Sequence, residues 1–429
     1  MMKGSKEPPA SVTSMTINTI ALMTSLLTAG WLLTPGANIA VMYAVLLIGA
    51  AYALPIVVLE AMWLAPHRHS VKRNIQQVVD VPRVLVKLLG LSVTLLLIVG
   101  VYSLFPEYRG AFYQKYYAAL RLLAPWFVVV AVPYFFWMDR RDGGERDGYW
   151  HMGQLALLRW DHIDRRIVGQ HLLGWTVKLF FLPLMFIYFT GKVQYFRTFH
   201  FELVFSSFKF FYDFAFEALF YVDLLIAVVG YLCTFKATDS HIRSTEPTFL
   251  GWAVAIMCYQ PFWSFFSANY LDYQPDIQWG KWFWDNTVMY VVWGSSILML
   301  TGIYVWSSLA FGIRFSNLTH RGILTNGPYR YCKHPAYLSK NLSYWLISMP
   351  FMVSSTVDES LRYCLLLLLL NGVYLLRART EERHLSQDPD YCAYARYIEE
   401  HGLLRRLGRW LPALRFRPGQ LFNLQAAKG

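Results

Sequence analysis

Apolar stretches of about twenty residues recur along this chain, and they constrain its fold more than any other feature. A helix rises about 1.5 Å per residue, so about 20 apolar residues cross the hydrocarbon core of a bilayer. Polar clusters divide the stretches into ten predicted spans, near residues 15–33, 39–64, 83–104, 117–138, 172–191, 213–235, 249–268, 287–311, 335–355 and 363–380. We therefore expect an all-α, polytopic integral membrane protein.

The composition excludes the soluble alternatives. Of the 429 residues, 56% are hydrophobic and 15% are charged, whereas soluble domains average about 25% charged residues. Such a chain lacks the charges to cover a soluble surface or to stay disordered, but lipid can solvate its apolar side chains. The five cysteines are scattered without a C-x-x-C pair, so the sequence predicts neither a disulfide framework nor a metal site.

Lysine and arginine are distributed unevenly between the predicted loops. Segments on the side of the N-terminus hold 27 of the 39 basic residues, whereas the opposite loops hold seven. Cytoplasmic loops of membrane proteins are enriched in these residues. We expect a bacterial inner-membrane protein with both termini and segment 312–340 in the cytoplasm. This bias accounts for the net charge of +12 without nucleic-acid binding. No small-residue cleavage motif follows the first stretch, so we expect it to be retained as a helix.

Residues 312–341 combine turn signals with side chains that carry chemistry. The run Asn-Gly-Pro at 326–328 predicts a turn. Pro335 suits the first position of a helix, because its missing N–H is not needed there. His334 then caps the helix that begins the ninth span. A partly polar stripe of that helix carries Tyr337, Asn341 and Trp345 at helical spacing.

The ninth and tenth spans predict an antiparallel hairpin. Both legs are about 30 Å long at helical rise, so Glu381 and Glu382 return level with His334 at the cytoplasmic boundary. The hairpin should gather one polar cluster, made of Tyr329, Arg330, Lys333, His334, Tyr337, Asn341, Glu381 and Glu382. The segment that begins at Asp388 is amphipathic and is expected to lie over this cluster.

Three motifs in order resemble a known family. They are Gly327-Pro328-Tyr329-Arg330-Tyr331-x-Lys333-His334-Pro335-x-Tyr337, then, after the hairpin, Glu381-Glu382-x-x-Leu385, and Asp388-Pro389-Asp390-Tyr391-x-x-Tyr394. The set resembles the isoprenylcysteine carboxyl methyltransferase family and the related phospholipid N-methyltransferases, over about residues 290–402. Each motif alone is weak, but the three at this spacing are specific.

The resemblance implies S-adenosylmethionine as cofactor, bound on the cytoplasmic side beneath the C-terminal segment, and a lipophilic acceptor that enters from the bilayer. Carried over residue by residue, it assigns cofactor binding to Tyr329, Arg330, His334, Pro335, Tyr337, Glu381 and Glu382, and we add Asn341 from the same stripe. Two positions depart from the family pattern. Lys333 stands where Arg is usual, which keeps the positive charge but lacks the planar fork of a guanidinium. Ser339 stands where Gly is usual.

The predicted cluster also suits this cofactor chemically. Tyr rings can stack on adenine or contact a sulfonium. Glu can accept from ribose hydroxyls or an ammonium, and Arg330 or the helix start at Pro335 can hold a carboxylate. No catalytic residue is assigned, because a carboxylate acceptor needs no base. An amine acceptor must lose a proton, for which Glu381, Glu382 or His334 are the candidates.

Three ionisable residues fall inside predicted spans, where they are costly and often functional. They are Lys178, Glu217 and Asp223. We expect Lys178 either to pair with one of the two carboxylates and lock two helices or to line an acceptor pocket. His67 and His69 form a possible metal pair, but no carboxylate lies near them in sequence, which favours an interfacial role.

The sequence suggests three regions. Residues 1–286 form a transmembrane region of unknown role, 287–402 a methyltransferase-like core, and 403–429 a basic tail suited to anionic lipids. The predicted function is methyl transfer from S-adenosylmethionine to a prenylated thiol carboxylate, an aminophospholipid head group or another lipid-linked group. A sterol-reductase-like enzyme using NADPH and a non-catalytic scaffold or transporter are the alternatives.

Overall fold

The chain folds almost entirely into helices, as expected. The structure, a computed structural model, describes residues 7–34, 36–63, 78–142, 144–352, 356–406, 408 and 415–416. Eight of the described helices are long and apolar enough to cross a membrane. They are α1 (Met15–Leu32), α2 (Val41–Trp63), α3 (Val81–Leu104), α4 (Gln114–Arg141), α6 (Arg165–Arg197), α7 (Phe208–Leu232), α11 (Thr287–Leu309) and α13 (Val357–Leu385). The prediction of an all-α, polytopic integral membrane protein is confirmed.

Shorter elements complete the described fold. The short helices are α5 (Gly148–Ala156), α8 (Phe249–Ile256), α9 (Phe262–Asn269), α10 (Trp279–Trp282), α12 (Pro335–Ser348) and α14 (Pro389–His401). Two strands, β1 (Ser244–Thr245) and β2 (Thr319–His320), pair antiparallel, with Ser244 opposite His320.

Two of the ten predicted spans are not single long helices. Span 249–268 is divided into α8 and α9, which flank Pro261; a proline lacks the N–H that a continuous helix needs. Span 335–355 contains α12, which stops at Ser348. Met349 follows in the left-handed conformation, directly before Pro350. The residue before a proline is disfavoured in the helical region, so the helix ends here. The apolar sequence continues past this point, which is why the predicted span was longer than the helix.

The predicted ten crossings compare with eight helices of sufficient length and apolarity among the described residues. The pairing of β1 with β2 brings the segments before α8 and after α11 to the same end. Because α11 is one long helix, the stretch from α8 to residue 286 must carry the chain back. The helices α12 and α13 form the two legs of the predicted hairpin. With 14 residues, or about 21 Å, α12 is much shorter than the 29 residues of α13. The prediction of equal legs is wrong.

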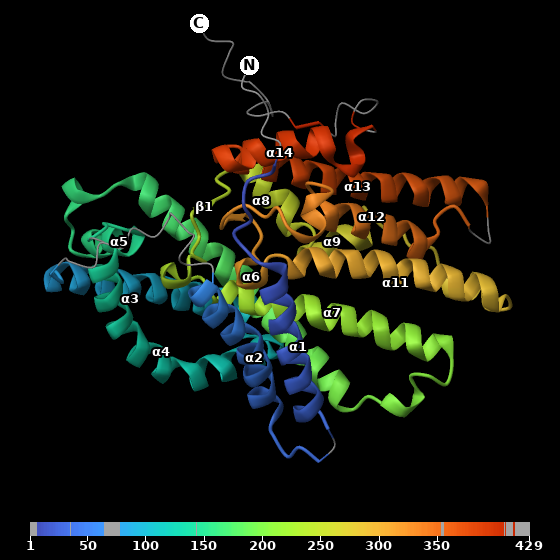
Figure 1. The fold of residues 1–429 in the computed structure, drawn as a ribbon, viewed down its shortest axis with the longest axis horizontal. Helices are drawn as coiled ribbons and strands as arrows, with labels where there is room; N and C mark the ends of the chain where they lie inside the picture. The colour runs from blue at the N-terminus through green and yellow to red at the C-terminus, as the bar shows by residue number, and fades with distance from the viewer. Residues whose placement is uncertain are drawn as a thin grey trace, which may run out of the picture.

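The last helices lie side by side. Figure 1 shows α7, α11, α12 and α13 as neighbouring rods, with α14 across one end of the α12–α13 hairpin, and α3, α4 and α5 at the other side of the molecule. The largest apolar core lies between α1, α2, α6 and α7. Large apolar side chains such as Leu54 and Val129 remain exposed on α2 and α4, which suits a surface that lipid solvates.

The segment before α1 is attached to the loop between α11 and α12. The Val12 amide donates to the Ile323 carbonyl over 3.1 Å, and the Thr325 hydroxyl donates to the Pro9 carbonyl. Within α1, the buried Asn18 amide donates to the Leu309 carbonyl at the end of α11. We call residues 9–18 the N-terminal strap, because their hydrogen bonds attach the start of the chain to this loop and to the end of α11.

Candidate functional site

The loop between α11 and α12 is anchored by two buried arginines. Arg321 donates to the carbonyls of Gly230, Cys233, Ser240, Ile313 and Phe315. Gly230 and Cys233 belong to the end of α7, where carbonyls lack helical partners. Arg314 pairs with Glu60 of α2 at 2.9 Å. Burial lowers the pKa of Arg321 to about 9, and Arg314 adds to the shift. The loop is thus fixed to the N-terminal helices.

Glu382 ties the two legs of the hairpin together. Its carboxylate lies 3.2 Å from Nε2 of His334, 2.8 Å from Nζ of Lys333 and 3.0 Å from a guanidinium nitrogen of Arg379. The Glu382 side chain is buried. Three positively charged or donor groups around one buried carboxylate satisfy it, as such a charge requires. The predicted proximity of Glu381 and Glu382 to His334 is therefore observed, although the legs differ in length.

A second polar network involves Glu381 and, one helical turn before it on α13, Arg377. The Tyr337 hydroxyl donates to Glu381 over 2.8 Å, and the Arg377 guanidinium lies 5.2 Å from the Tyr337 ring. Arg377 also donates to the Asn317 side-chain oxygen over 2.6 Å. The Asn317 amide in turn donates to the hydroxyl of Tyr259. This network joins the loop, α12 and α13 to a residue that follows α8.

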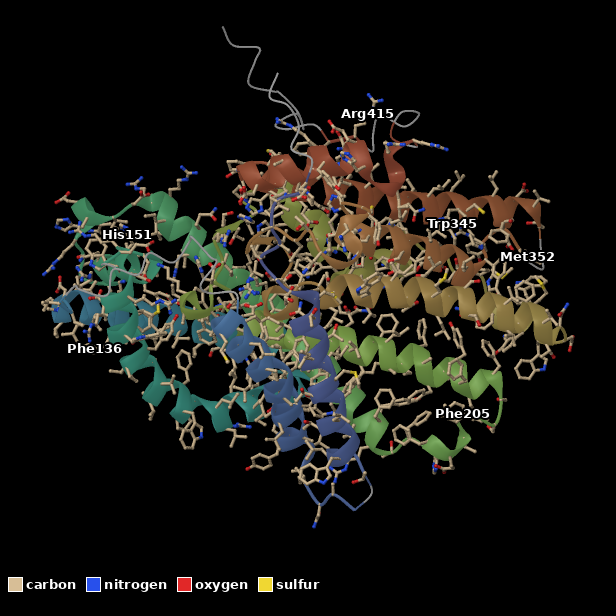
Figure 2. The ribbon with its side chains drawn as sticks, in the orientation of Figure 1. Phe136, His151, Phe205, Trp345, Met352 and Arg415 are labelled. Atoms are coloured by element: carbon tan, nitrogen blue, oxygen red, sulfur yellow. The ribbon has the colours of Figure 1, made fainter. Side chains whose placement is uncertain are left out.

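Helix α14 covers this end of the hairpin. The Tyr394 hydroxyl donates to the Tyr329 carbonyl over 2.8 Å, and Nε2 of His320 lies 3.2 Å from a carboxylate oxygen of Asp388, the residue that caps α14. Tyr391 is also buried, but its hydroxyl has no hydrogen-bond partner in the described structure. Figure 2 shows Arg415 above α13 and α14, where its carbonyl accepts from Arg379. The predicted cover over the cluster is observed.

These elements enclose a cavity. Its lining includes residues of α11, the following loop, α12, α13 and α14, together with Glu246 and Tyr259 from the preceding part of the chain. The aromatic and charged lining residues are Tyr259, Tyr304, Phe311, Phe315, Tyr329, Tyr337, Tyr374, Tyr391, Tyr394, Glu246, Arg314, Arg321, Lys333, His334, Lys340, Arg377, Glu381 and His384. Burial raises the pKa of Tyr329, Tyr391 and Tyr394 well above the ordinary value. These three hydroxyls are therefore neutral donors.

The predicted site residues are placed differently from one another. Tyr329, His334, Tyr337 and Glu381 line the cavity. Pro335 begins α12 as predicted and is buried, and Glu382 lies behind the lining in its ion pairs.

Arg330 and Asn341 are not brought to the cavity. Arg330 ends a short 3-10 turn, Gly327–Arg330, and is exposed. Asn341 donates to the Tyr337 carbonyl within α12, and neither residue is among those that line the cavity. Ser339, which stands where the family usually has Gly, donates its hydroxyl to the Pro335 carbonyl. This side chain therefore also bonds within α12.

Sequence reasoning missed several lining residues. Arg377 lies four residues before Glu381, and Lys340 three residues after Tyr337, so helical spacing from the motif residues could have found both. Tyr374 is one further turn along α13. Tyr259 carried no local signal, because only the folding of the chain brings it to the Arg377 network.

The ionisable residues inside the spans do not pair as predicted. Glu217 pairs with Lys192 of the same helical hairpin, and Asp223 accepts hydrogen bonds from Tyr304 and Ser308 of α11. Within the described chain Lys178 has neither carboxylate as an ion-pair partner; its ammonium lies over the Trp175 ring. The prediction that Lys178 locks two helices through a carboxylate is wrong. His67 and His69 lie outside the described residues, as does most of the tail from 407 onward.

Fold and site together define a polytopic α-helical membrane protein. Its aromatic and charged cavity is lined by α11, the following loop, α12 and α13, and α14 covers it. Residues 288–387 match the model of the isoprenylcysteine carboxyl methyltransferase (ICMT) family. The predicted family resemblance is confirmed for this C-terminal part. No curated protein and no solved structure matches the chain.

The matched region ends just before Asp388, so the third motif is outside it. The match supports a membrane methyltransferase of the isoprenylcysteine type, and it agrees with the integral membrane location that the apolar helices indicate.

Proposed function

We propose that the protein transfers a methyl group from S-adenosylmethionine to a lipophilic acceptor held in the membrane. The family match supports the reaction class, and methyltransferases of this family generally use S-adenosylmethionine. The observation that carries the proposal further is the placement of Arg377 and Glu381. They lie one turn apart on α13, and both meet Tyr337 at the cavity wall.

That pair matches the amino-acid end of the cofactor, which is a zwitterion. A carboxylate on the cofactor suits the Arg377 guanidinium, which can present two parallel N–H donors. An ammonium suits the Glu381 carboxylate. Arg377 takes the part that the sequence had suggested for Arg330, since the Arg330 side chain is exposed away from the cavity.

The cover supplies groups for the nucleoside end. Tyr391 and Tyr394 of α14, with Phe311 from the loop after α11, offer ring faces on which adenine can stack. The Tyr391 hydroxyl is buried and neutral, and it has no hydrogen-bond partner among the described residues. Leaving such a donor unsatisfied is costly, so a ligand that accepts from it restores the lost hydrogen bond. The residues present therefore fit the cofactor.

When bound, S-adenosylmethionine supplies a methyl group on a sulfonium that a nucleophile displaces. The chain contributes alignment and exclusion of water rather than covalent chemistry. Helix α14 covers the cavity on one side, and tyrosine rings contact a sulfonium favourably. Glu381 already accepts from Tyr337 and His334 is held by Glu382, so both are fixed in orientation. The acceptor class remains a carboxylate of the isoprenylcysteine type or a lipid head group.

Calorimetry on the detergent-purified chain tests the proposal. S-adenosylmethionine should bind with micromolar affinity, and Glu381→Gln should weaken binding at least tenfold, because the charge that holds the ammonium is removed. Glu400→Gln, an exposed carboxylate on α14, is the matched control and should bind as the parent does. A folded parent that binds NADPH but not S-adenosylmethionine would instead support the reductase alternative.

We also propose that both termini and segment 312–340 face the cytoplasm of a bacterial inner membrane, and that the basic tail contacts anionic lipids. The unequal distribution of Lys and Arg supports the orientation. We assign residues 1–286 a supporting role for the core at 287–402. The strap, Glu60, Glu246 and Tyr259 all reach the loop or the cavity.

A further inference from the structure

Lys340 lies in the cavity one turn beyond Tyr337, further from the cover. Its ammonium lies 5.2 Å from the ring centre of Tyr304 and 5.9 Å from those of Tyr344 and Tyr374. Tyr304 belongs to α11 and Tyr374 to α13, so rings from three helices surround one cation. We call Lys340 with these three rings the tyrosine cage.

The charge in this cage lacks a direct partner. In the part of the chain that the structure describes, no hydrogen bond joins the ammonium to another group, and no carboxylate lies within 4 Å of it. Asp223 of α7 is the nearby carboxylate, but it is engaged by the Tyr304 hydroxyl at 2.7 Å and by Ser308 at 2.6 Å. The Lys340 side chain is half-buried. Ring faces stabilise a cation only in part, so an anionic partner would stabilise the ammonium further.

The cage lies beside Arg377 and Tyr337, with the Tyr374 ring centre 5.8 Å from that of Tyr337, on the side away from Glu381 and the cover. Tyr374 precedes Glu381 by seven residues on α13, about 10 Å of helix. Arg377 and Glu381 together match a zwitterion and leave no unmatched anion for Lys340. The lysine therefore faces the other occupant of the cavity, the acceptor.

We infer that Lys340 binds an anionic group of the acceptor, either a carboxylate or a phosphate ester, within the tyrosine cage. The inference rests on the proposed function and narrows its substrate class. Lys340 lies within the matched region 288–387, whereas the neighbouring carboxylate Asp223 comes from α7, outside that region. The N-terminal helices thus shape the acceptor end of the cavity.

The cage predicts how an acceptor is selected. A carboxylate acceptor places its charge on Lys340, and an aminophospholipid places its phosphate there. A lipid whose head group carries only a positive charge meets the ammonium and is repelled. Neutral lipids lose the ion pair and gain only the apolar contacts. Anionic amphiphiles should therefore bind more tightly than neutral ones of the same chain length.

Three probes with one hydrocarbon chain test this on the purified full-length chain. Oleate carries a carboxylate, oleyl phosphate carries a phosphate, and oleyl alcohol is neutral. We expect at least one anionic probe to bind ten times more tightly than the alcohol, and Lys340→Met to remove that preference. Lys281→Met, at an exposed lysine, should keep it. Comparing oleate with oleyl phosphate tells which anion the cage prefers.

Equal binding of all three probes by the parent would overturn the inference, and so would a preference that survives in Lys340→Met. If that variant is not monodisperse in size-exclusion chromatography, Asp223→Asn replaces it. Removing the neighbouring negative charge must tighten binding of the anionic probes, and an unchanged or weaker affinity overturns the inference. Binding of S-adenosylmethionine is measured separately. Its loss from the parent, with Lys340-dependent anion binding retained, would sink the proposed function alone.

Discussion

Nε2 of His334 lies 3.2 Å from a carboxylate oxygen of Glu382, although the two residues are 48 positions apart. His334 caps the start of α12 and Glu382 lies near the end of α13. The contact closes the hairpin at the cavity. With Lys333 and Arg379 on the same carboxylate, this cluster fixes the wall that holds Tyr337 and Glu381.

Replacing Glu382 by Gln should therefore destabilise the fold rather than only the site. Removing one partner of a buried ion pair leaves uncompensated charge and costs about 3 kcal/mol. We expect a clearly lower midpoint of thermal unfolding, measured by scanning fluorimetry in detergent. Glu400→Gln changes the same chemical group on the surface of α14 and should leave the midpoint unchanged. An equal midpoint for both variants would show that the cluster contributes nothing to stability.

The sequence suggested Arg330 as the group that holds the cofactor carboxylate, whereas the structure places Arg377 at the cavity. Arg377→Met should weaken S-adenosylmethionine binding by about tenfold to a hundredfold, the effect of a lost hydrogen bond to a charged group. Arg330→Met should have no effect, since the Arg330 side chain is exposed outside the cavity. Titration calorimetry on both variants decides between them. A loss confined to Arg330→Met would restore the prediction made from the motif.

Two tyrosines of α14 should respond in opposite ways. Tyr391→Phe removes a buried hydroxyl that has no partner in the described part of the chain, so the unfolding midpoint should hold or rise while S-adenosylmethionine affinity falls about threefold to tenfold. Tyr394→Phe removes a hydrogen bond to the Tyr329 carbonyl and should cost about 1 kcal/mol of stability. If Tyr391→Phe binds as tightly as the parent, its hydroxyl does not face the cofactor.

His320 should make stability depend on pH. Burial lowers its pKa to about 4 from 6.5, against the opposing effect of Asp388, with Arg243 and His384 adding to the decrease. The unfolded chain takes up the proton first, so the stabilising contribution is complete above pH 6.5 and is lost as pH falls toward 4. His320→Gln should flatten this dependence of the unfolding midpoint between pH 4 and 7. His162→Gln, at an exposed histidine, should retain the full slope.

The N-terminal strap should affect both stability and binding. Asn18→Ala removes donors to the Leu309 and Ala310 carbonyls and leaves buried acceptors unsatisfied, at about 1–3 kcal/mol. Because the strap holds the loop that leads to His334, S-adenosylmethionine affinity should fall as well. Thr19→Ala changes the exposed neighbour on α1 and serves as control. Unaltered binding by a destabilised Asn18→Ala protein would confine the strap to a stabilising role.

Span prediction succeeded where an apolar run was also an uninterrupted helix. Near α8 and α12 the run continued through Pro261 and up to Pro350, so hydropathy alone extended helices that backbone chemistry ends. The hairpin still brought Glu382 to His334, because the start of α12 and the end of α13 lie next to each other although the legs differ in length.

The sequence by itself determined the membrane fold, the start of α12 at Pro335, the hairpin and the motif residues His334, Tyr337 and Glu381. These follow from local rules of helix length, capping and spacing. Only the tertiary structure decided which side chains meet in the cavity. Arg330 is turned outward by a short turn, while Tyr259 enters from a segment with no motif of its own. Contacts between distant segments depend on how helices pack, and no local pattern encodes that packing.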